Sequence, residues 1–537
     1  MTETVQLRPA WCYVALMAGQ QARPLKGRFN NIPVLHSNQP EIVGGPGILV
    51  NSAPGSAIAT ETNRPLKNAS FTFNGEFGVH VHHKYYPKDT SKLGGTRARG
   101  LLTVATIAIN PGGKPVTLTF EKGSVKNSFE APYHPNHLMG VKPLGPRPWN
   151  TGPGDATSVQ MLRSQLDRKL TEMIVIPPGG RKVIFSTMLP ARGIANGLLK
   201  GKSDGPFQMA VVAAEETNRN RDLISVLDSG RLAPGRIYLK RIREIESGRV
   251  FSRVAGVALG DRYQASIRHD LQQGALHVPL TSTHKHNFGT REVQVNPLTT
   301  RMIDSAVNNV GTYGVRFDVT MHLHGSGPHQ LVMSHPVVSG KKRFTAFRGS
   351  IGIESHEGYK EVHVGLRSGE SLPLSDLTLK AGVVNPVKVS LVYPADATPG
   401  HLLSVVPVQQ MAVLKKRQQM IEQARLAELK RKKRNVNPAA PPPTIKTANK
   451  PATEAIDKAV IRTGASRPLG KRTNPLLPAH RRPIAPPPPP ALVSPAGGIT
   501  PMTPAVILPP RINSSLEQRY REAIKAQQEW LDRFKGR

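Results

Sequence analysis

The sequence is short of cysteine, of long apolar runs and, in its C-terminal part, of aromatic residues. Its single cysteine, Cys12, can form neither an internal disulfide nor a zinc site of several thiolates. No run reaches the roughly 20 apolar residues that a membrane-spanning helix needs. After Gln410 no aromatic residue occurs before Tyr520, so bases of single-stranded nucleic acid would find no ring to stack on. These absences speak against a disulfide scaffold, a helical membrane protein and a single-strand binder.

Acidic residues are half as numerous as basic ones. Lys and Arg number 72 and Asp and Glu 36, which gives a formal net charge of +36. Such a charge attracts polyanions by long-range electrostatics, whether nucleic acid, anionic lipid or acidic polysaccharide. The excess is concentrated after Gln410, where 25 basic residues against 8 acidic ones leave +17.

The short motifs of common enzymes are also missing. The chain has no Walker A run, no dinucleotide-binding fingerprint, no nucleophile elbow and no His-Glu-x-x-His sequence. No pair of carboxylates at a defined spacing indicates a glycosidase. The sequence therefore favours a non-enzymatic protein and predicts no cofactor, although loops of a β protein can still hold an active site.

What the chain does have is the alternation of apolar and polar residues that is typical of half-buried strands. In Leu101–Phe120 and again in Val315–His335, two such runs flank a cluster rich in Gly and Pro, which predicts two β-hairpins. About sixty residues after each turn, Ile176–Ser186 and Leu379–Pro394 repeat a second pattern, a Gly/Pro loop before an alternating strand. The repetition predicts a mainly β protein with two β-sandwich (Ig-like) modules in tandem. Leucine and methionine spacing predicts one helix in the first half, over Ser158–Leu170.

These patterns and the change of composition at Gln410 divide the chain into seven segments. They are an N-terminal segment that resembles a weak or incomplete signal peptide (1–22), a first β-sandwich module (23–217), a connection (218–249), a second β-sandwich module (250–410), a basic helix (411–434), a Pro-rich disordered linker (435–512) and a short amphipathic helix (513–537). The last helix begins with a capping box at Ser514 and Glu517, and its apolar face either binds a partner or folds back on the chain.

Histidine is the residue that most indicates chemistry. In a His-x-His sequence on a strand, both imidazoles lie on one face at a spacing that can share a metal. If the second hairpin pairs directly across its loop, His329 lies opposite His324. The alternative is that these are polar side chains facing solvent, because no cysteine or carboxylate cluster completes a ligand set. The candidate metal ligands are His80, His82, His322, His324 and His329.

A dense basic run ends the helix predicted at 411–434. It consists of Lys430, Arg431, Lys432, Lys433 and Arg434. Such a run can bind a phosphate backbone, an anionic lipid surface or an acidic polysaccharide. It is equally typical of a solvated helix end, where cations favour the C-terminal dipole.

Several strings together resemble one cyanobacterial family, catalogued as a domain of unknown function (three-three-seven-zero). They are Asn30–Asn38 (NNIPVLHSN), Arg253–Gly260 (RVAGVALG), Phe347–Gly349 (FRG) and Tyr393–Pro399 (YPADATP), and the resemblance runs from about Gln20 to Val408. The resemblance implies an exported protein, since members typically carry a signal peptide, but it implies no activity, cofactor or catalytic residue. A clear signal peptide is lacking here, which leaves a cytoplasmic location open if the N-terminus is complete and uncleaved.

We therefore expect a non-enzymatic structural or binding protein of the cell envelope, or a secreted one, whose basic tail attaches to an anionic polymer, a lipid surface or a partner protein. Two alternatives stay open. One is a polysaccharide-active or metal-dependent hydrolase that uses the strand histidines. The other is a nucleic-acid binder that uses the basic tail.

Overall fold

The computed structural model describes residues 14–17, 20–87, 101–133, 139–146, 151–235, 237–247, 253–336, 343–395 and 397–435. The fold is mainly β, built from several sheets, as the alternation predicts. The predicted linker 435–512 and terminal helix 513–537 lie almost wholly outside these residues, as does most of the segment 1–22. Within the described part, no helix is long and apolar enough to cross a membrane.

The first β region consists of two sheets that share one hydrophobic core. The larger sheet has the order β11 (Met173–Ile176), β9 (Val116–Asn127), β13 (Ile194–Ser203), β7 (Glu76–Tyr85), β2 (Pro33–Ser37), β15 (Ala255–Leu259) and β18 (Leu298–Arg301), with β3 (Ile42–Val43) also paired to β7. The smaller has the order β12 (Arg181–Leu189), β8 (Leu102–Ile109), β14 (Gln208–Glu215) and β4 (Gly47–Asn51). Apolar side chains from both sheets, such as Phe77 and Val104, fill the space between them.

The second β region repeats this plan with its own core. Its larger sheet has the order β1 (Arg28–Phe29), β16 (Arg262–Asp270), β19 (Arg316–His324), β24 (Asn385–Val392), β21 (Thr345–Ser355), β22 (Gly358–Arg367) and β10 (Gly140–Pro143). Its smaller sheet has the order β17 (Leu276–Leu280), β25 (His401–Pro407), β20 (Gly327–Ser334) and β23 (Ser371–Leu379). Phe317 and Leu331 are among the fully buried side chains that join the two sheets.

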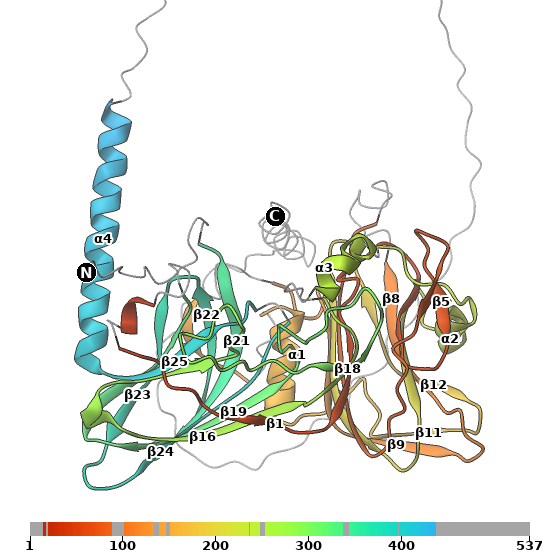
Figure 1. Ribbon diagram of the computed structural model, residues 1–537, viewed down its shortest axis with the longest axis horizontal. Coiled ribbons are helices and arrows are strands. Elements are labelled where there is room, and N and C mark those ends of the chain that lie inside the picture. Colours follow the sequence, from red (N-terminus) through yellow and green to blue (C-terminus); the bar gives the residue numbers. More distant parts are fainter. Residues whose placement is uncertain are drawn as a thin grey trace, which may run out of the picture. The chain divides into compact units, whose positions relative to one another are not determined.

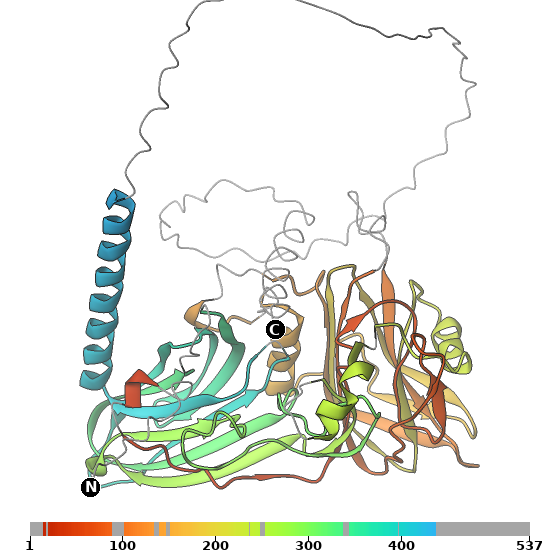
Figure 2. The ribbon, with the colours of Figure 1, turned by 45° about the horizontal axis from the view of Figure 1, so that its top comes forward.

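Strand pairing crosses the segment boundaries expected from the sequence. The short strand β1 pairs with β16, and β10 pairs with β22, so two strands from the first half of the chain extend the second β region. In the other direction, β15 and β18 extend the first β region through the pairing of β15 with β2. The N-terminal segment, red in Figures 1 and 2, accordingly runs along β16 before it enters the first region. The two regions are thus joined by strands that each contributes to the other. That each region is an Ig-like sandwich stays a prediction.

Both predicted hairpins are wrong. Strands β8 and β9 follow each other in the chain but lie in different sheets, and so do β19 and β20. The partners are instead the strands on either side of the Gly/Pro loop of the second repeated pattern. Strand β12 pairs with β8 and β11 with β9, while β23 pairs with β20 and β24 with β19. A turn sequence alone does not fix whether the returning strand pairs with its neighbour or crosses to the facing sheet.

A buried asparagine holds each pair of connecting loops together. Asn110 donates from Nδ2 to the carbonyl oxygens of Lys114, at 2.7 Å, and of Ile176, at 3.1 Å, and so links the loop after β8 to the loop after β11. Asn385 donates in the same way to the carbonyl oxygens of Lys380 and Leu323. These bonds connect the loops on either side of each crossing strand.

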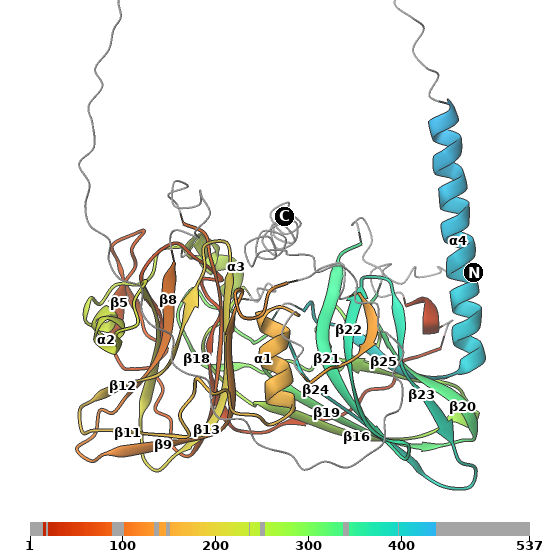
Figure 3. The same cartoon turned by 180° about the vertical axis from the view of Figure 1, so that it is seen from behind.

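Helix α1 (Pro153–Leu162) lies between the two β regions (Figure 3). All ten of its residues are buried, and it contacts β9 and β13 on one side and β21 and β24 on the other. It begins earlier than predicted, with Pro153 in its first turn, and it ends at Leu162, two residues before Ser164 with its φ of 53°. The Asp155 carboxylate binds the imidazole of His363 at 3.1 Å and the hydroxyl of Ser350 at 3.0 Å, which connects the helix to β22 and β21.

The remaining elements lie outside these layers. Helix α2 (Asn220–Asp228) contacts the smaller sheet of the first region, and α3 (Ile242–Glu246) follows a 3-10 turn at Ile237–Arg241. Two further 3-10 turns lie at Ala15–Met17 and Leu271–Gln273, and β5 (Ser56–Ile58) pairs with β6 (Pro65–Lys67). The long helix α4 (Val408–Asn435) begins directly after β25, and its residues Met411 and Leu414 are buried against Leu16 and Val406. The helix expected at 411–434 lies within these bounds.

Candidate functional site: a pocket between the two β regions

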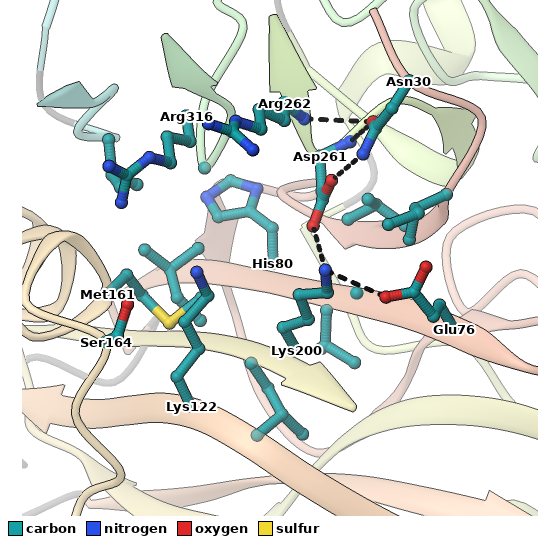
Figure 4. Close-up of a pocket in the computed structure, with 18 of the residues that line it drawn as sticks. Asn30, Glu76, His80, Lys122, Met161, Ser164, Lys200, Asp261, Arg262 and Arg316 are labelled. Atoms are coloured by element: carbon teal, nitrogen blue, oxygen red, sulfur yellow. Dashed lines mark hydrogen bonds and ion pairs between the residues drawn. The ribbon is translucent and has the colours of Figure 1, made fainter. Parts of the chain in front are cut away.

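A pocket of about 480 Å³ opens where the larger sheets of the two regions approach each other. Strands β7, β9 and β13 of the first region supply one wall. Strands β16, β19 and β24 of the second region supply the other, and the end of α1 contributes Met161. The volume lies in the usual range for small-molecule sites. Figure 4 shows that its lining is rich in charged side chains.

Two lysines face each other on neighbouring strands of the first wall. Lys122 of β9 and Lys200 of β13 are direct partners in the antiparallel register, whereas Gly201 already pairs with Phe120. Glu121 is therefore the extra residue of a β-bulge, a feature that re-aims a side chain and is common beside functional sites. Both lysines line the pocket, and we refer to them as the lysine pair.

The charge of Lys200 is well compensated. Its ammonium lies 3.1 Å from Glu76, 3.8 Å from Glu121 and 4.0 Å from Asp261. Burial alone would lower the pKa of Lys200, but these carboxylates outweigh burial and raise it. Lys200 therefore stays charged.

The charge of Lys122 is not compensated in the same way. Within the described part of the chain, no carboxylate lies at ion-pair distance from its ammonium. Burial lowers the pKa of Lys122, and the positive charges of Arg316 and Lys200 lower it further against a weaker opposing effect of Asp261 and Glu121. A half-buried cation that other cations surround is costly to maintain, and such groups are enriched at functional sites.

The opposite wall holds its arginines rigidly. Asp318 of β19 binds Arg262 at 2.6 Å and Arg316 at 2.9 Å, and its second oxygen accepts a hydrogen bond from Ser390. Arg316 also donates to the carbonyl oxygen of Leu162 at the end of α1. Burial tends to raise the pKa of Asp318, but its bonds to Arg316 and Ser390 outweigh burial and lower it. The guanidinium of Arg316 is thereby fixed at the pocket edge.

His80 of β7 completes the lining, and a partner that the sequence did not indicate lies beside it. His36 of β2 is its register partner in the parallel pair β2–β7, and the two Nδ1 atoms are 3.2 Å apart. Both rings are buried, and neither Nε2 atom has a hydrogen-bond partner. Burial lowers the pKa of His36 to about 3 and that of His80 well below 6.5, so both are neutral at physiological pH.

The predicted metal ligands are not brought together as a set. His82 lies two residues from His80 on β7 and bonds Asn196 at 2.9 Å, whereas His322 and His324 lie on β19 in the other region. The expectation that His329 lies opposite His324 is wrong, because β20 pairs with β23 and β25 and not with β19. Among the described residues, no three His, Cys, Asp or Glu side chains form a group that could hold a metal ion. A metal at these histidines stays a prediction.

The basic run of the sequence lies in the last turns of α4. Residues 430–434 are helical, and the side chain of Arg431 is exposed. The side chains of Lys430, Lys432, Lys433 and Arg434 lie outside the described part.

Sequence reasoning missed most of the pocket. Glu76, Asp261, Lys122 and Lys200 come from positions spread over 185 residues and carry no motif. The one usable signal was the interruption of alternation at Glu121-Lys122, directly after the regular run Val116–Phe120. It marks the bulge but does not show which strand lies opposite.

The comparisons with known proteins give a family but no activity. The sequence model of a family described as "Protein of unknown function (DUF3370)" matches residues 20–407. None of the curated proteins matches the chain. Among solved structures, a Paenibacillus xanthan lyase is similar at 10% identity with a TM-score of 0.13, over 69% of this chain and 27% of the lyase. A TM-score this low carries no conclusion on fold or function.

Proposed function

The chain belongs to the DUF3370 family of proteins of unknown function, and we propose from its site that it is a non-enzymatic binding protein that holds the anionic group of a ligand at the lysine pair. The observation that carries the proposal is the direct pairing of Lys122 with Lys200. Like charges directly opposite each other on neighbouring strands are destabilising. An anion between them turns that repulsion into two charge-assisted hydrogen bonds.

The distribution of charge supports an anionic ligand over a cationic one. Three acids already surround Lys200 and Asp318 binds Arg316, so the lining cation without an ion-pair partner among the described residues is Lys122. A carboxylate or sulfate that enters the pocket compensates Lys122 without displacing an existing ion pair. The carboxylates of Glu76 and Asp261 remain on the other side of Lys200, where they can accept hydrogen bonds from ligand hydroxyl groups.

A polysaccharide hydrolase is the competing function, because the pocket does contain two carboxylates. Glycoside hydrolysis requires one carboxyl to act as an acid and the other as a base or nucleophile across the bond that is cleaved. Here Glu76 and Asp261 both bind the ammonium of Lys200. The lysine therefore lies where the sugar bond would have to pass, and this geometry favours binding over hydrolysis.

The ligand class that fits this pocket is the acidic saccharide of an envelope polymer. Its hydroxyl groups suit the acceptors Glu76 and Asp261, and its anionic groups suit Lys122 and Arg316. A cell-envelope or secreted location and attachment through the basic tail are parts of this proposal. They are supported by the charge of +17 after Gln410 and by the exposed Arg431 of α4.

Calorimetric titration at low salt with D-glucuronate and with its neutral methyl ester tests the proposal. We expect the wild-type protein to bind glucuronate at least about tenfold more tightly than the ester, because a charge-assisted bond is lost in the ester. Lys122→Met should remove this preference. Lys182→Met, which changes an exposed lysine on β12, is the matched control and should leave binding unchanged. Equal binding by Lys122→Met and wild type, or no binding of glucuronate, sulfate or phosphate by the wild type, would contradict the proposal.

A further inference from the structure

A second pocket, of about 560 Å³, borders the same end of α1 as the pocket of the lysine pair. Met161 and Ser164 line the first pocket, as Figure 4 shows, whereas Gln160 and Gln165 line the second. One short stretch of chain, residues 160–165, therefore borders both pockets. We refer to the second one, after its two glutamines, as the amide pocket.

Strand β9 also runs along both pockets. Lys122 lines the first and Lys126 the amide pocket, and residues two or four apart on a strand lie on the same face. Ser124 lies between them on that face and donates to Oε1 of Gln160, which joins the strand to α1 between the two pockets. Four residues of strand place the Cα atoms of the two lysines roughly 13 Å apart. A ligand that occupies both pockets is therefore longer than one monosaccharide.

The glutamines supply neutral hydrogen-bonding groups. Ser124 occupies Oε1 of Gln160, but the Nε2 group has no partner among the described residues and is not sealed from solvent. Gln160 is only 8% exposed, so packing fixes the position of this donor before a ligand arrives. Gln165 is exposed, and its amide can both donate and accept. Such groups suit the hydroxyl groups of a sugar.

The charged residues of the amide pocket leave one cation for a ligand. Lys126 binds Asp167 at 2.5 Å, and both side chains are at most 12% exposed, so these two charges compensate each other. Arg168 is exposed and has no carboxylate at ion-pair distance within the described part of the chain. Its guanidinium can bind an anionic group through charge-assisted hydrogen bonds, as Lys122 can in the first pocket.

We propose that the amide pocket is a second sugar subsite, and that the chain binds an acidic oligosaccharide that runs along β9 from the lysine pair to Arg168. The inference rests on the proposed function, because it takes the acidic saccharide of that proposal as one unit of a longer ligand. Successive units of an acidic polysaccharide each carry hydroxyl groups and can each carry an anionic group, which matches the cation and the hydrogen-bonding groups of each pocket. Two linked contacts raise the affinity above that of either one alone.

Calorimetric titration with linear glucuronate oligosaccharides of one to six units tests the inference. We expect the hexamer to bind wild type at least about tenfold more tightly than the monosaccharide, because only the longer ligand reaches both pockets. Arg168→Gln should weaken hexamer binding about tenfold and leave D-glucuronate binding within about twofold of wild type. Arg221→Gln, which changes an exposed arginine on α2, is the matched control for loss of one positive charge and should leave both affinities unchanged. Equal binding of monosaccharide and hexamer would overturn the inference.

A variant that keeps the net charge gives a second, independent test. Gln160→Met removes the Nε2 donor at similar side-chain size and should weaken hexamer binding about fivefold. Thermal unfolding checks that it folds, because Ser124 loses its acceptor. If Lys122→Met weakens binding of both ligands while Arg168→Gln and Gln160→Met bind the hexamer like wild type, only this inference fails. If Lys122→Met also binds both ligands like wild type, the proposed function fails with it.

Discussion

Lys122 and Lys200 are direct register partners on β9 and β13, so two lysines from neighbouring strands line the same pocket. Of these two lysines, Lys200 has carboxylates at ion-pair distance, whereas Lys122 has none among the described residues. Lys122 thus lowers stability in the absence of ligand, and Lys122→Met should raise the free energy of unfolding by about 0.2–1 kcal/mol, the range for cross-strand side-chain pairs. Urea unfolding at pH 7 measures this. Lys182→Met on exposed β12 should change stability by less, and a destabilised Lys122→Met would contradict this account of the pair.

The gain in unfolding free energy expected for Lys122→Met should also depend on pH. Burial and the neighbouring cations lower the pKa of Lys122. The charged lysine therefore reduces the free energy of unfolding by its full amount at neutral pH, where it is charged in both the folded and the unfolded chain. The cost disappears above the ordinary lysine pKa, where both forms are neutral. The stability difference between Lys122→Met and wild type should therefore shrink toward alkaline pH. A difference that is constant from pH 7 to alkaline pH would show that packing, not charge, causes it.

The buried carboxylate of Glu41 stabilises the fold, in contrast to Lys122. Glu41 binds Lys84 at 2.7 Å and also contacts Arg253, and all three side chains are at most 20% exposed. Glu41→Gln should cost about 3–5 kcal/mol of unfolding free energy, because it removes one partner from buried ion pairs. The control is Glu354→Gln, whose pair with Lys388 is about half exposed and should contribute less than about 1 kcal/mol. Similar losses in the two variants would contradict this ranking.

The Glu41 contribution should also be lost in acid. Burial alone would raise the pKa of Glu41, but Arg253 and Lys84 outweigh it and lower the pKa to about 2. A lowered carboxyl pKa stabilises the fold above the pKa of the unfolded chain, and this stability disappears as the pH falls from about 4.5 toward 2. Glu41→Gln should therefore approach the stability of wild type over this interval.

The buried histidines make the protein sensitive to milder acid. Burial lowers the pKa of His36, His83 and His335 to about 3 and that of His277 to about 4. The unfolded chain takes up these protons near pH 6.5, so the unfolded state binds more protons and the free energy of unfolding falls as pH drops below that value. Each histidine contributes about 1.4 kcal/mol per pH unit. Urea unfolding between pH 7 and pH 5 should show this slope, reduced by one proton in His83→Gln. A flat profile would contradict the burial of these rings.

The start of α4 packs on the folded core, so the position of a truncation within α4 should affect stability. Met411 and Leu414 are buried against Leu16 and Val406, so the first turns of the helix belong to the folded core. A chain truncated after Gln410 should melt at a lower temperature than one truncated after Gln423, because burial of two apolar side chains is lost. If the tail tethers the protein, neither truncated chain should be found in the envelope fraction. Envelope association of the chain truncated after Gln423 would contradict a tether at residues 424–537.

The sequence predicted the class of fold but not the pairing of its strands. Alternation at Val116–Phe120 and in β19 identified strands correctly, because one face of each is buried. It could not tell a hairpin from a crossing connection, since the strands that pair with β8, β9, β19 and β20 come from elsewhere in the chain.

The candidate site was predicted only in part. Alternation placed His80 and His82 on one strand face, but the partner of His80 lies 44 residues away on β2. The lysine pair could not be predicted for the same reason. The bulge at Glu121 places Lys122 beside Lys200 only because β9 pairs with β13, and the sequence does not show that pairing. The net charge and composition predicted attraction to polyanions in general. The pairing of β9 with β13 in the structure located the candidate anion site.

The most direct test of the account is a crystal structure of the full chain with D-glucuronate. The account predicts the ligand carboxylate in the pocket between the two β regions, within hydrogen-bond distance of the Lys122 ammonium. Glucuronate bound only elsewhere on the protein, with the lysine pair empty at saturating concentration, would contradict it.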